Sequence, residues 1–181
     1  MEAARAPEVP GGVNPTAGSI LGFLDVLGPL TGWDINQMIE TSIGNFWHVT
    51  RSQIYRELRD LVGRGYVVQG APGPRSRSVH EITDEGRQSF RTWLARDPGP
   101  DVIRNRLLLT VFFGDHLDPR RLTEILLDQR ASHAASLARY RELQQDLGTT
   151  SAMASTLRFG ISYEEVLIAW IDSLPWIHDE L

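Results

Sequence analysis

The feature that most constrains this chain lies between residues 50 and 86, where a short amphipathic segment precedes two β-forming stretches. Thr50 and Gln53 have the spacing of a helix-capping box. Apolar residues then recur at helical spacing on one face, namely Ile54, Leu58, Leu61 and Val62. The pattern predicts a helix that begins near Thr50 and ends between Gly63 and Gly65, because glycine is favoured at helix ends.

A basic hairpin is predicted to follow this helix. Residues 66–69 and 78–82 are rich in β-formers, and the two prolines and the glycine of residues 71–77 predict an irregular loop between them. Arg75 and Arg77 lie in that loop. A helix followed by a hairpin with a basic tip is typical of a winged helix-turn-helix. In that motif the helix enters the DNA major groove and the wing contacts phosphates or the minor groove.

The side chains expected to contact DNA lie on the polar face of the helix, at its start and in the loop. An ordinary solvated helix and a solubilising loop would contain the same residue types, so their succession favours DNA binding more than either segment alone. The candidate DNA-binding residues are Thr50, Arg51, Ser52, Gln53, Tyr55, Arg56, Arg59, Arg75 and Arg77.

Basic residues are concentrated in this region of an otherwise acidic chain. The sequence has 18 Arg and no Lys against 23 acidic residues, a formal net charge of −5. Residues 51–77 hold six Arg and two acids, whereas residues 97–181 hold eight Arg and thirteen acids. Such asymmetry indicates a nucleic-acid-binding face. Every guanidinium can donate two hydrogen bonds to a phosphate or a guanine.

Three more helices are predicted in the first half of the chain. One covers residues 17–27, and a second begins with the capping pattern of Thr31 and Asp34. A third runs from Thr83 to about Arg96. The apolar residues expected to pack in this domain include Trp33, Ile35, Met38, Ile39, Ile43, Phe46, Trp47, Phe90, Trp93 and Leu94.

Residues 97–100, with sequence DPGP, form the clearest linker and predict a domain boundary. The pattern beyond them is helical throughout. A long helix is expected from Asp118-Pro119 to about Leu147, then a short helix to Gly160, and a last helix capped by Ser162 and kinked at Pro175. The long helix has a weak heptad seam, which predicts packing inside a helical domain or across a dimer. Its positions are Leu122, Leu126, Gln129, His133, Ser136, Tyr140, Leu143 and Leu147.

Several segments together resemble the PadR-like transcriptional regulators. They are GSILGFLDVLGPLTGWDINQMIE, FWHVTRSQIYRELRDLVGRGYVV and SVHEITDEGRQSF. Two later segments, RNRLLLTVFFGDHLDPRRLTEILLDQR and LRFGISYEEVLIAWIDSL, resemble the helical dimerisation domain that longer PadR-like proteins share with the AphA-type virulence regulators. Trp33 and His80 stand where the family usually has Tyr. Both are expected at core or wing-base positions.

The resemblance implies a mainly α fold, with an N-terminal winged helix-turn-helix of three helices and a β-hairpin wing, followed by an all-helical C-terminal dimerisation domain. The expected organisation is a disordered tail at 1–15, a DNA-binding domain at 16–97 and a dimerisation domain at 101–181. It implies a dimeric regulator, more often a repressor than an activator. Two isologous copies would read a palindromic double-stranded operator.

Some members of the family release DNA on binding small aromatic compounds, so an aromatic effector is a possible partner. A cavity between the domains could contain Trp93, Phe112, Phe113, Trp170 and Trp176. The alternative is that these aromatic residues pack in cores and interfaces. In the same way, His133 is interpreted as a hydrogen-bonded interface residue rather than a ligand or pH sensor.

Other classes of function have less support. The chain contains no cysteine, no phosphate-binding glycine loop and no His pair at metal-binding spacing, so we expect neither enzymatic activity nor a cofactor or metal. The first residues lack the apolar core of a signal peptide, and no stretch is long and apolar enough to cross a membrane. We therefore expect a cytoplasmic protein that does not bind membranes. The alternative function is a helical protein–protein adaptor on a winged-helix scaffold without sequence-specific DNA binding.

Overall fold

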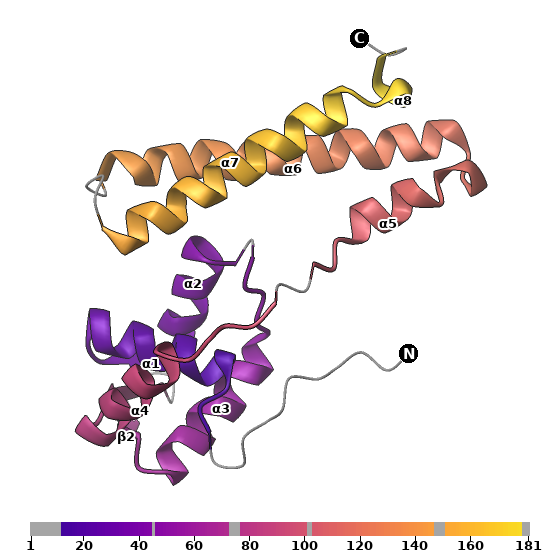
Figure 1. The fold of residues 1–181 in the computed structure, drawn as a ribbon. Helices are drawn as coiled ribbons and strands as arrows, with labels where there is room; N and C mark the ends of the chain where they lie inside the picture. The colour runs from indigo at the N-terminus through magenta and orange to yellow at the C-terminus, as the bar shows by residue number, and fades with distance from the viewer. Residues whose placement is uncertain (1–11, 45, 73–76, 101–102, 147–150, 179–181) are drawn as a thin grey trace. The chain divides into compact units, whose positions relative to one another are not determined.

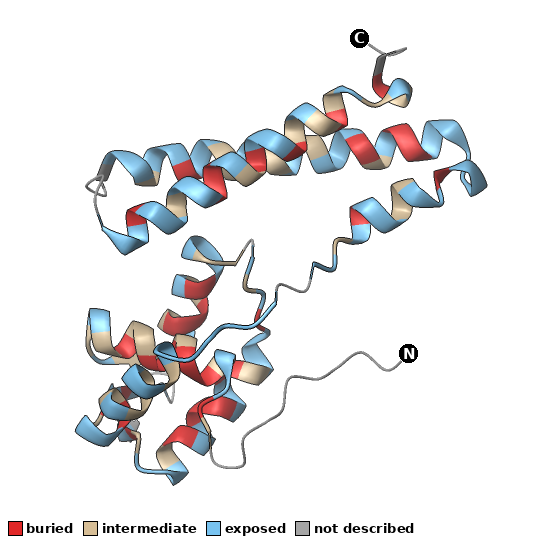
Figure 2. Ribbon diagram, viewed as in Figure 1, coloured by how far each residue is buried: buried red, intermediate tan, exposed pale blue. Residues whose placement is uncertain are grey.

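The computed structural model describes residues 12–44, 46–72, 77–100, 103–146 and 151–178 (Figure 1). The chain divides into two compact units, Met1–Gly99 and Pro100–Leu181. Each unit has its own buried core, as Figure 2 shows. The predicted fold class is confirmed: the chain is mainly helical, with one small antiparallel sheet in the first unit.

The described residues of the first unit form four helices and three short strands. None of its elements exceeds 13 residues, so packing of amphipathic faces rather than helix length stabilises them. The elements are α1 (Pro15–Leu27), β1 (Leu30–Thr31), α2 (Gly32–Ser42), α3 (Arg51–Gly63), β2 (Val67–Pro72), β3 (Ser78–Ile82) and α4 (Asp84–Leu94).

Side-chain caps fix where the helices of this unit begin. At α2 the hydroxyl of Thr31 accepts from the Asp34 amide at 3.2 Å, and the Asp34 carboxylate accepts from the Thr31 amide at 3.0 Å. At α3 Thr50 and Gln53 form the same reciprocal pair, at 3.3 and 2.8 Å. Both predicted capping boxes are therefore confirmed.

The start of the folded region differs from the sequence prediction. Val13 is buried, and the Asn14 side chain accepts from the Ala17 amide to cap α1. These contacts place residues 12–15 in the domain and not in the expected tail. The rest of that tail, residues 1–11, lies outside the described residues.

The core of the first unit is formed where α1, α2 and α3 meet. Trp93 of α4 packs directly over Gly18 of α1, where a β-carbon would come within 2.6 Å of the indole. The glycine therefore makes room for the aromatic ring. The buried members of this core are Val13, Ala17, Ile20, Leu21, Leu24, Ile35, Ile39, Val49, Ile54, Leu58, Leu61, Val67 and Ile82.

Four of the apolar residues assigned to this core from the sequence are exposed instead. Phe46 is 48% exposed and Leu94 is 63% exposed, and Trp33 and Met38 are exposed to a smaller degree. The buried residues of α2 are Gly32, Ile35, Asn36 and Ile39, of which Ile35 and Ile39 are its large apolar side chains. Helical spacing of apolar residues thus overestimated how much of each helix is covered by its neighbours.

The sheet has the strand order β1-β3-β2, so β3 is hydrogen-bonded on both sides. β1 was not predicted, because two residues carry no recognisable strand pattern. β2 continues to Pro72, although an irregular loop was predicted to begin at residue 71. The pairing register with β3 shifts between Gln69 and Pro72. Proline is compatible with this place because β2 is an edge strand. Arg75 lies outside the described residues.

The second unit is a helical hairpin with shorter helices at its ends. Its elements are α5 (Arg106–Phe112), the 3-10 turn η2 (Gly114–His116), α6 (Pro119–Asp146), α7 (Ala152–Asp172) and α8 (Pro175–His178). The core contains Leu107, Leu122, Leu126, Ile171 and Ile177. None of the helices in the described part of the chain combines the length and apolarity needed to cross a membrane.

The predicted division of the last 30 residues into helices was wrong. α7 is continuous, with Ser151 as its N-cap, and Ser162 lies inside it and caps nothing. Gly160 is buried within α7, and the packing of this face outweighs the weak helix propensity of glycine. Pro175 begins a separate helix and does not kink α7, because proline suits a first turn.

The seam of α6 packs within the unit, against α7. Leu122, Leu126 and Tyr140 are almost completely buried, whereas Gln129 is exposed. The last seam position, Leu147, lies outside the described residues.

Among the described residues, three contacts between a basic and an acidic side chain link α6 to α7. The Arg130 guanidinium donates to both oxygens of Asp172, and this contact holds the pKa of the Asp172 carboxyl below its usual range. Arg141 pairs with Glu165 at 2.8 Å, and both side chains are exposed. The third pair joins His133 to Glu164, whose side chain is only 2% exposed, with Nδ1 and Oε2 2.5 Å apart. A carboxylate this deeply buried depends on its hydrogen-bond partner.

His133→Ala is expected to lower the free energy of unfolding of the helical unit by about 3 kcal/mol, since it leaves a buried carboxylate without this partner. Arg141→Ala is the matched control. It removes an ion pair between the same two helices at exposed positions, where a loss below about 1 kcal/mol is expected. Urea denaturation followed by circular dichroism measures both values, and equal losses would contradict the role given to burial.

Candidate nucleic-acid interface

The two faces of α3 have opposite character. Ile54, Leu58 and Leu61 are buried against the core. Glu57 is also buried, and its carboxylate accepts from the Asn14 side chain at 3.0 Å. The other face is exposed and carries Arg51, Ser52, Tyr55, Arg56 and Arg59, so that five of the predicted DNA-binding residues share one accessible surface.

Two other predicted residues contribute to the start of the helix. Thr50 and Gln53 are engaged with each other in the capping box, through both backbone amides and through a contact of 2.9 Å between the Thr50 hydroxyl and the Gln53 carbonyl oxygen. Their first role is therefore to fix the N-terminus of α3. That N-terminus carries unpaired amides and partial positive charge, which favour an approaching anion.

The wing is attached to α2 through β1. Leu30 pairs with His80 and Thr31 pairs with Val79, in antiparallel register. Since α2 begins at the residue after β1, this pairing places the first turn of α2 beside the base of the wing. No pattern in residues 28–31 predicted this link, because the segment resembles only a helix end followed by a helix cap.

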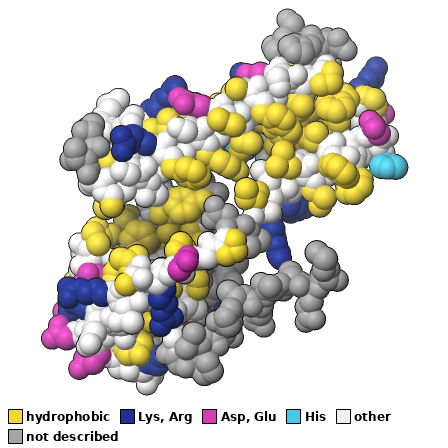
Figure 3. All heavy atoms as spheres, in the orientation of Figure 1, with side chains coloured by type: hydrophobic (Ala, Val, Ile, Leu, Met, Phe, Trp, Pro, Cys, Tyr) yellow, Lys and Arg dark blue, Asp and Glu magenta, His cyan; other side chains and the backbone are white. Residues whose placement is uncertain are grey.

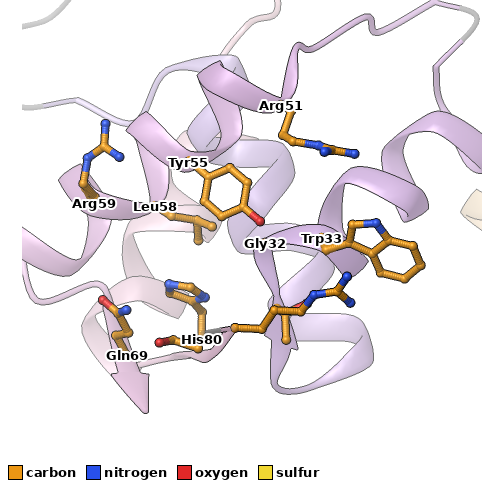
Figure 4. Close-up of a pocket in the computed structure, with 11 residues that line it drawn as sticks. Gly32, Trp33, Arg51, Tyr55, Leu58, Arg59, Gln69 and His80 are labelled. Atoms are coloured by element: carbon orange, nitrogen blue, oxygen red, sulfur yellow. The ribbon is translucent and has the colours of Figure 1, made fainter. Parts of the chain in front are cut away.

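A hollow of about 530 Å³ lies between α3, the start of α2 and the wing strands (Figure 4). Tyr55 and Leu58 point into it from α3, and His80 points toward them from β3. Three arginines line it, two from α3 and one from the wing. The lining residues are Thr31, Gly32, Trp33, Arg51, Tyr55, Leu58, Arg59, Gln69, Arg77, Ser78 and His80.

The ring of Tyr55 lies close to Gly32 beside the hollow. A β-carbon at Gly32 would lie 2.7 Å from the tyrosine ring and 3.2 Å from the Leu58 side chain. Only a residue without a side chain allows the ring to lie against the backbone here. The position of Tyr55 on the exposed face of α3 therefore depends on a glycine in α2.

Arg77 of the wing lies over the ring of Trp33, with its guanidinium carbon 4.9 Å from the ring centroid. This is the distance of a cation–π contact, in which the negative face of the indole attracts the cation. The contact joins the wing to the first turn of α2 on the side facing the hollow.

His80 contributes shape to the hollow and not charge. Burial lowers the pKa of its imidazole below the ordinary histidine value, while backbone groups of Leu30 and Ser78 act in the opposite direction. Its Nδ1 atom has no hydrogen-bond partner among the described residues. A lowered pKa keeps the ring neutral near pH 7, so that the positive charge around the hollow comes from the arginines.

Not every predicted residue joins this site. Ser52 and Arg56 are exposed on α3 but do not line the hollow, and Arg56 lies 3.7 Å from Glu57. No sequence pattern predicted that Gly32 and Trp33 contribute to this site. The GPLTGW segment gave no chemical signal for them, because their roles arise only when α2 and the wing are brought together.

The aromatic residues proposed for an effector cavity lie in different parts of the structure. Trp93 belongs to the first core, whereas Trp170 and Trp176 pack against the second core. Phe112 and Phe113 are exposed and contact each other edge to face, with ring centroids 4.9 Å apart. A cavity that combines residues of both units stays a prediction.

Metal binding has no visible site in the described part of the chain, where no three His, Cys, Asp or Glu residues are grouped to hold an ion.

Comparison with known proteins relates both units to one group of regulators. Residues 20–92 match the transcriptional regulator PadR-like family, and residues 103–174 match the virulence activator alpha C-terminal family. The chain is 26% identical over 175 residues to the negative transcriptional regulator PadR of Bacillus subtilis, covering 86% of this chain and 93% of that protein.

Solved structures of that relative have the same fold. B. subtilis PadR in complex with operator DNA superposes with a TM-score of 0.70 at 26% identity, covering 88% of this chain and 96% of that one. B. subtilis PadR in complex with p-coumaric acid gives a TM-score of 0.61 at 25% identity, covering 88% and 94%.

Gly32→Ala is expected to lower the free energy of unfolding by about 1–3 kcal/mol, because the added methyl group overlaps the ring of Tyr55. Gly63→Ala is the matched control, since a β-carbon there meets nothing within 4 Å and alanine favours a helix by up to about 1 kcal/mol. Thermal unfolding compares the two. A Gly32→Ala protein as stable as the parent would show that the contact is looser than described.

Proposed function

The chain belongs to the PadR-like family of transcriptional regulators, and we propose that it binds a specific double-stranded operator as a homodimer and represses transcription. The observation that carries this proposal is the hollow between α3 and the wing, where three arginines and one tyrosine from separate elements share one accessible surface. A regulator of transcription acts where the DNA is, so the proposal includes a cytoplasmic location, and it assigns the chain no catalytic activity.

The geometry suits a helix that reads base edges while its neighbours hold the DNA backbone. A helix and its side chains fill the major groove of B-DNA. Ser52 and Arg56 lie on the exposed face of α3 outside the hollow, which suits contacts with bases. Arg51, Arg59 and Arg77 line the concave surface beside it, which suits contacts with phosphates. Base contacts give sequence preference, and phosphate contacts give orientation and salt dependence.

A dimer is proposed because one reading helix contacts only a few base pairs, and two copies at a fixed separation recognise a palindrome. Helix α5 supports this. Leu107 and Val111 face the core of the helical unit, whereas Leu108, Leu109 and Phe112 are exposed, with Phe112 79% exposed. Figure 3 shows hydrophobic side chains gathered over the helical unit. An isologous contact between two copies would remove such side chains from water.

An aromatic effector is the second part of the proposal. The relative from B. subtilis has been solved with p-coumaric acid, and this chain holds Trp93 in the first unit and Phe112, Phe113, Trp170 and Trp176 in the second. Residues of this kind bind flat apolar ligands through stacking and burial. We propose that a small aromatic compound binds near them and weakens operator binding.

Selection of bound duplexes from a random DNA pool tests the central proposal. The expected product is an inverted repeat whose half-sites are about one helical turn, or a multiple of it, apart. Affinity for this duplex should fall steeply with salt. Recovery of no preferred sequence, with unchanged binding across duplexes at low salt, would favour the protein–protein adaptor and contradict the regulator.

Leu109→Glu combined with Phe112→Glu is expected to shift the protein from dimer to monomer at micromolar concentration, because burying two carboxylates in an apolar contact is strongly unfavourable. Leu94→Glu is the control, since it charges an equally exposed leucine in the other unit. Sedimentation equilibrium measures the mass of each. A parent protein that is monomeric under these conditions would contradict the proposed dimer.

A further inference from the structure

Arg77 is an exposed charged residue of the wing that lines the hollow. It comes directly before β3, and its long side chain can adopt many rotamers. Ordering such a side chain on binding is unfavourable by about 1–2 kcal/mol. An arginine already held in place by another residue avoids much of this loss.

Trp33 is well placed to hold it. The indole belongs to the first turn of α2. Two features fix the backbone of this turn, namely the capping box of Thr31 and Asp34 and the close approach of Tyr55 to Gly32. The pairing of β1 with β3 brings that turn beside the wing. Trp33 is 37% exposed, and the guanidinium of Arg77 lies over its ring, with the guanidinium carbon 4.9 Å from the ring centroid.

A guanidinium over an aromatic ring keeps its N–H groups available, because they point outward in the plane of the group. This is the geometry that binds a phosphate through two parallel hydrogen bonds. Arg51 and Arg59 line the same hollow from α3. They are eight residues apart, which corresponds to about 12 Å along a helix, so the three arginines surround a region that is longer than one phosphate group.

We propose that Trp33 is a positioning residue for DNA binding. Its ring holds Arg77 at the edge of the hollow, where Arg77, Arg51 and Arg59 together bind a stretch of the sugar–phosphate backbone that passes between α3 and the wing. The inference rests on the proposed DNA-binding function. It adds the start of α2 to the interface and assigns the hollow to phosphates, which leaves the outer face of α3 for bases.

The test compares Trp33→Leu, Trp33→Phe, Arg77→Ala and the Trp33→Leu/Arg77→Ala double variant with the parent. Binding is measured over a series of salt concentrations, on the selected inverted repeat and on a random duplex of equal length. Met38→Ala is the matched control, because Met38 lies on the same helix with similar exposure and does not line the hollow. Circular dichroism and melting temperature establish that each variant is folded.

Trp33→Leu should weaken binding to both duplexes by about two- to fivefold for each half-site, the size expected for one cation–π contact. It should also reduce the slope of log affinity against log salt by up to about 0.9 for each half-site. Trp33→Phe should retain most of the parent affinity, since an aromatic face remains. The double variant should bind as Arg77→Ala does, because the tryptophan acts through the arginine.

Several results would overturn the inference. They are a folded Trp33→Leu protein with the affinity and salt slope of the parent, a double variant whose losses multiply, and a loss restricted to the selected sequence. The last would indicate contact with bases and not with the backbone. Failure of the parent itself to bind either duplex would instead contradict the proposed function, so the two failures are distinguishable.

Discussion

The antiparallel pairing of β1 with β3 is the contact on which the DNA-binding surface depends. It has only two residue pairs, Leu30 with His80 and Thr31 with Val79. Because β3 is also paired with β2, the wing cannot move without breaking hydrogen bonds on one side. β1 leads directly into α2, and therefore the wing, the start of α2 and the exposed face of α3 form one surface and not three independent segments.

Side-chain packing adds further contacts between α2, α3 and the wing to those of the strand pairing. Gly32 lets the ring of Tyr55 lie against the first turn of α2, and the next residue, Trp33, receives the guanidinium of Arg77. One short turn thus contacts both the reading helix and the wing. Interiors at this density do not absorb an added methyl group without displacing a neighbour, which is why a methyl group added at Gly32 can alter the shape of the hollow.

The helical unit combines stable internal packing with an exposed apolar surface. α6 and α7 are joined by a buried His133–Glu164 contact. Two ion pairs with greater exposure, Arg130–Asp172 and Arg141–Glu165, also join them. Outside this hairpin, α5 covers the core with Leu107 and Val111 and leaves its other side exposed. A well-packed helical unit with an apolar surface is suited to hold two DNA-binding units at a constant separation, because the spacing of half-sites requires a fixed distance.

The amino-acid sequence by itself determined the helices that begin with strong caps, the amphipathic face of α3 and the concentration of arginine near it, because these depend on neighbours within a few residues. It failed at Gly160, where burial within the helical unit overrides a local helix breaker, and at Pro72, where an edge strand tolerates proline. Only the tertiary structure decided that Trp33 lies under Arg77. That contact depends on a strand pairing between residues about 50 positions apart, and no local pattern encodes such a meeting.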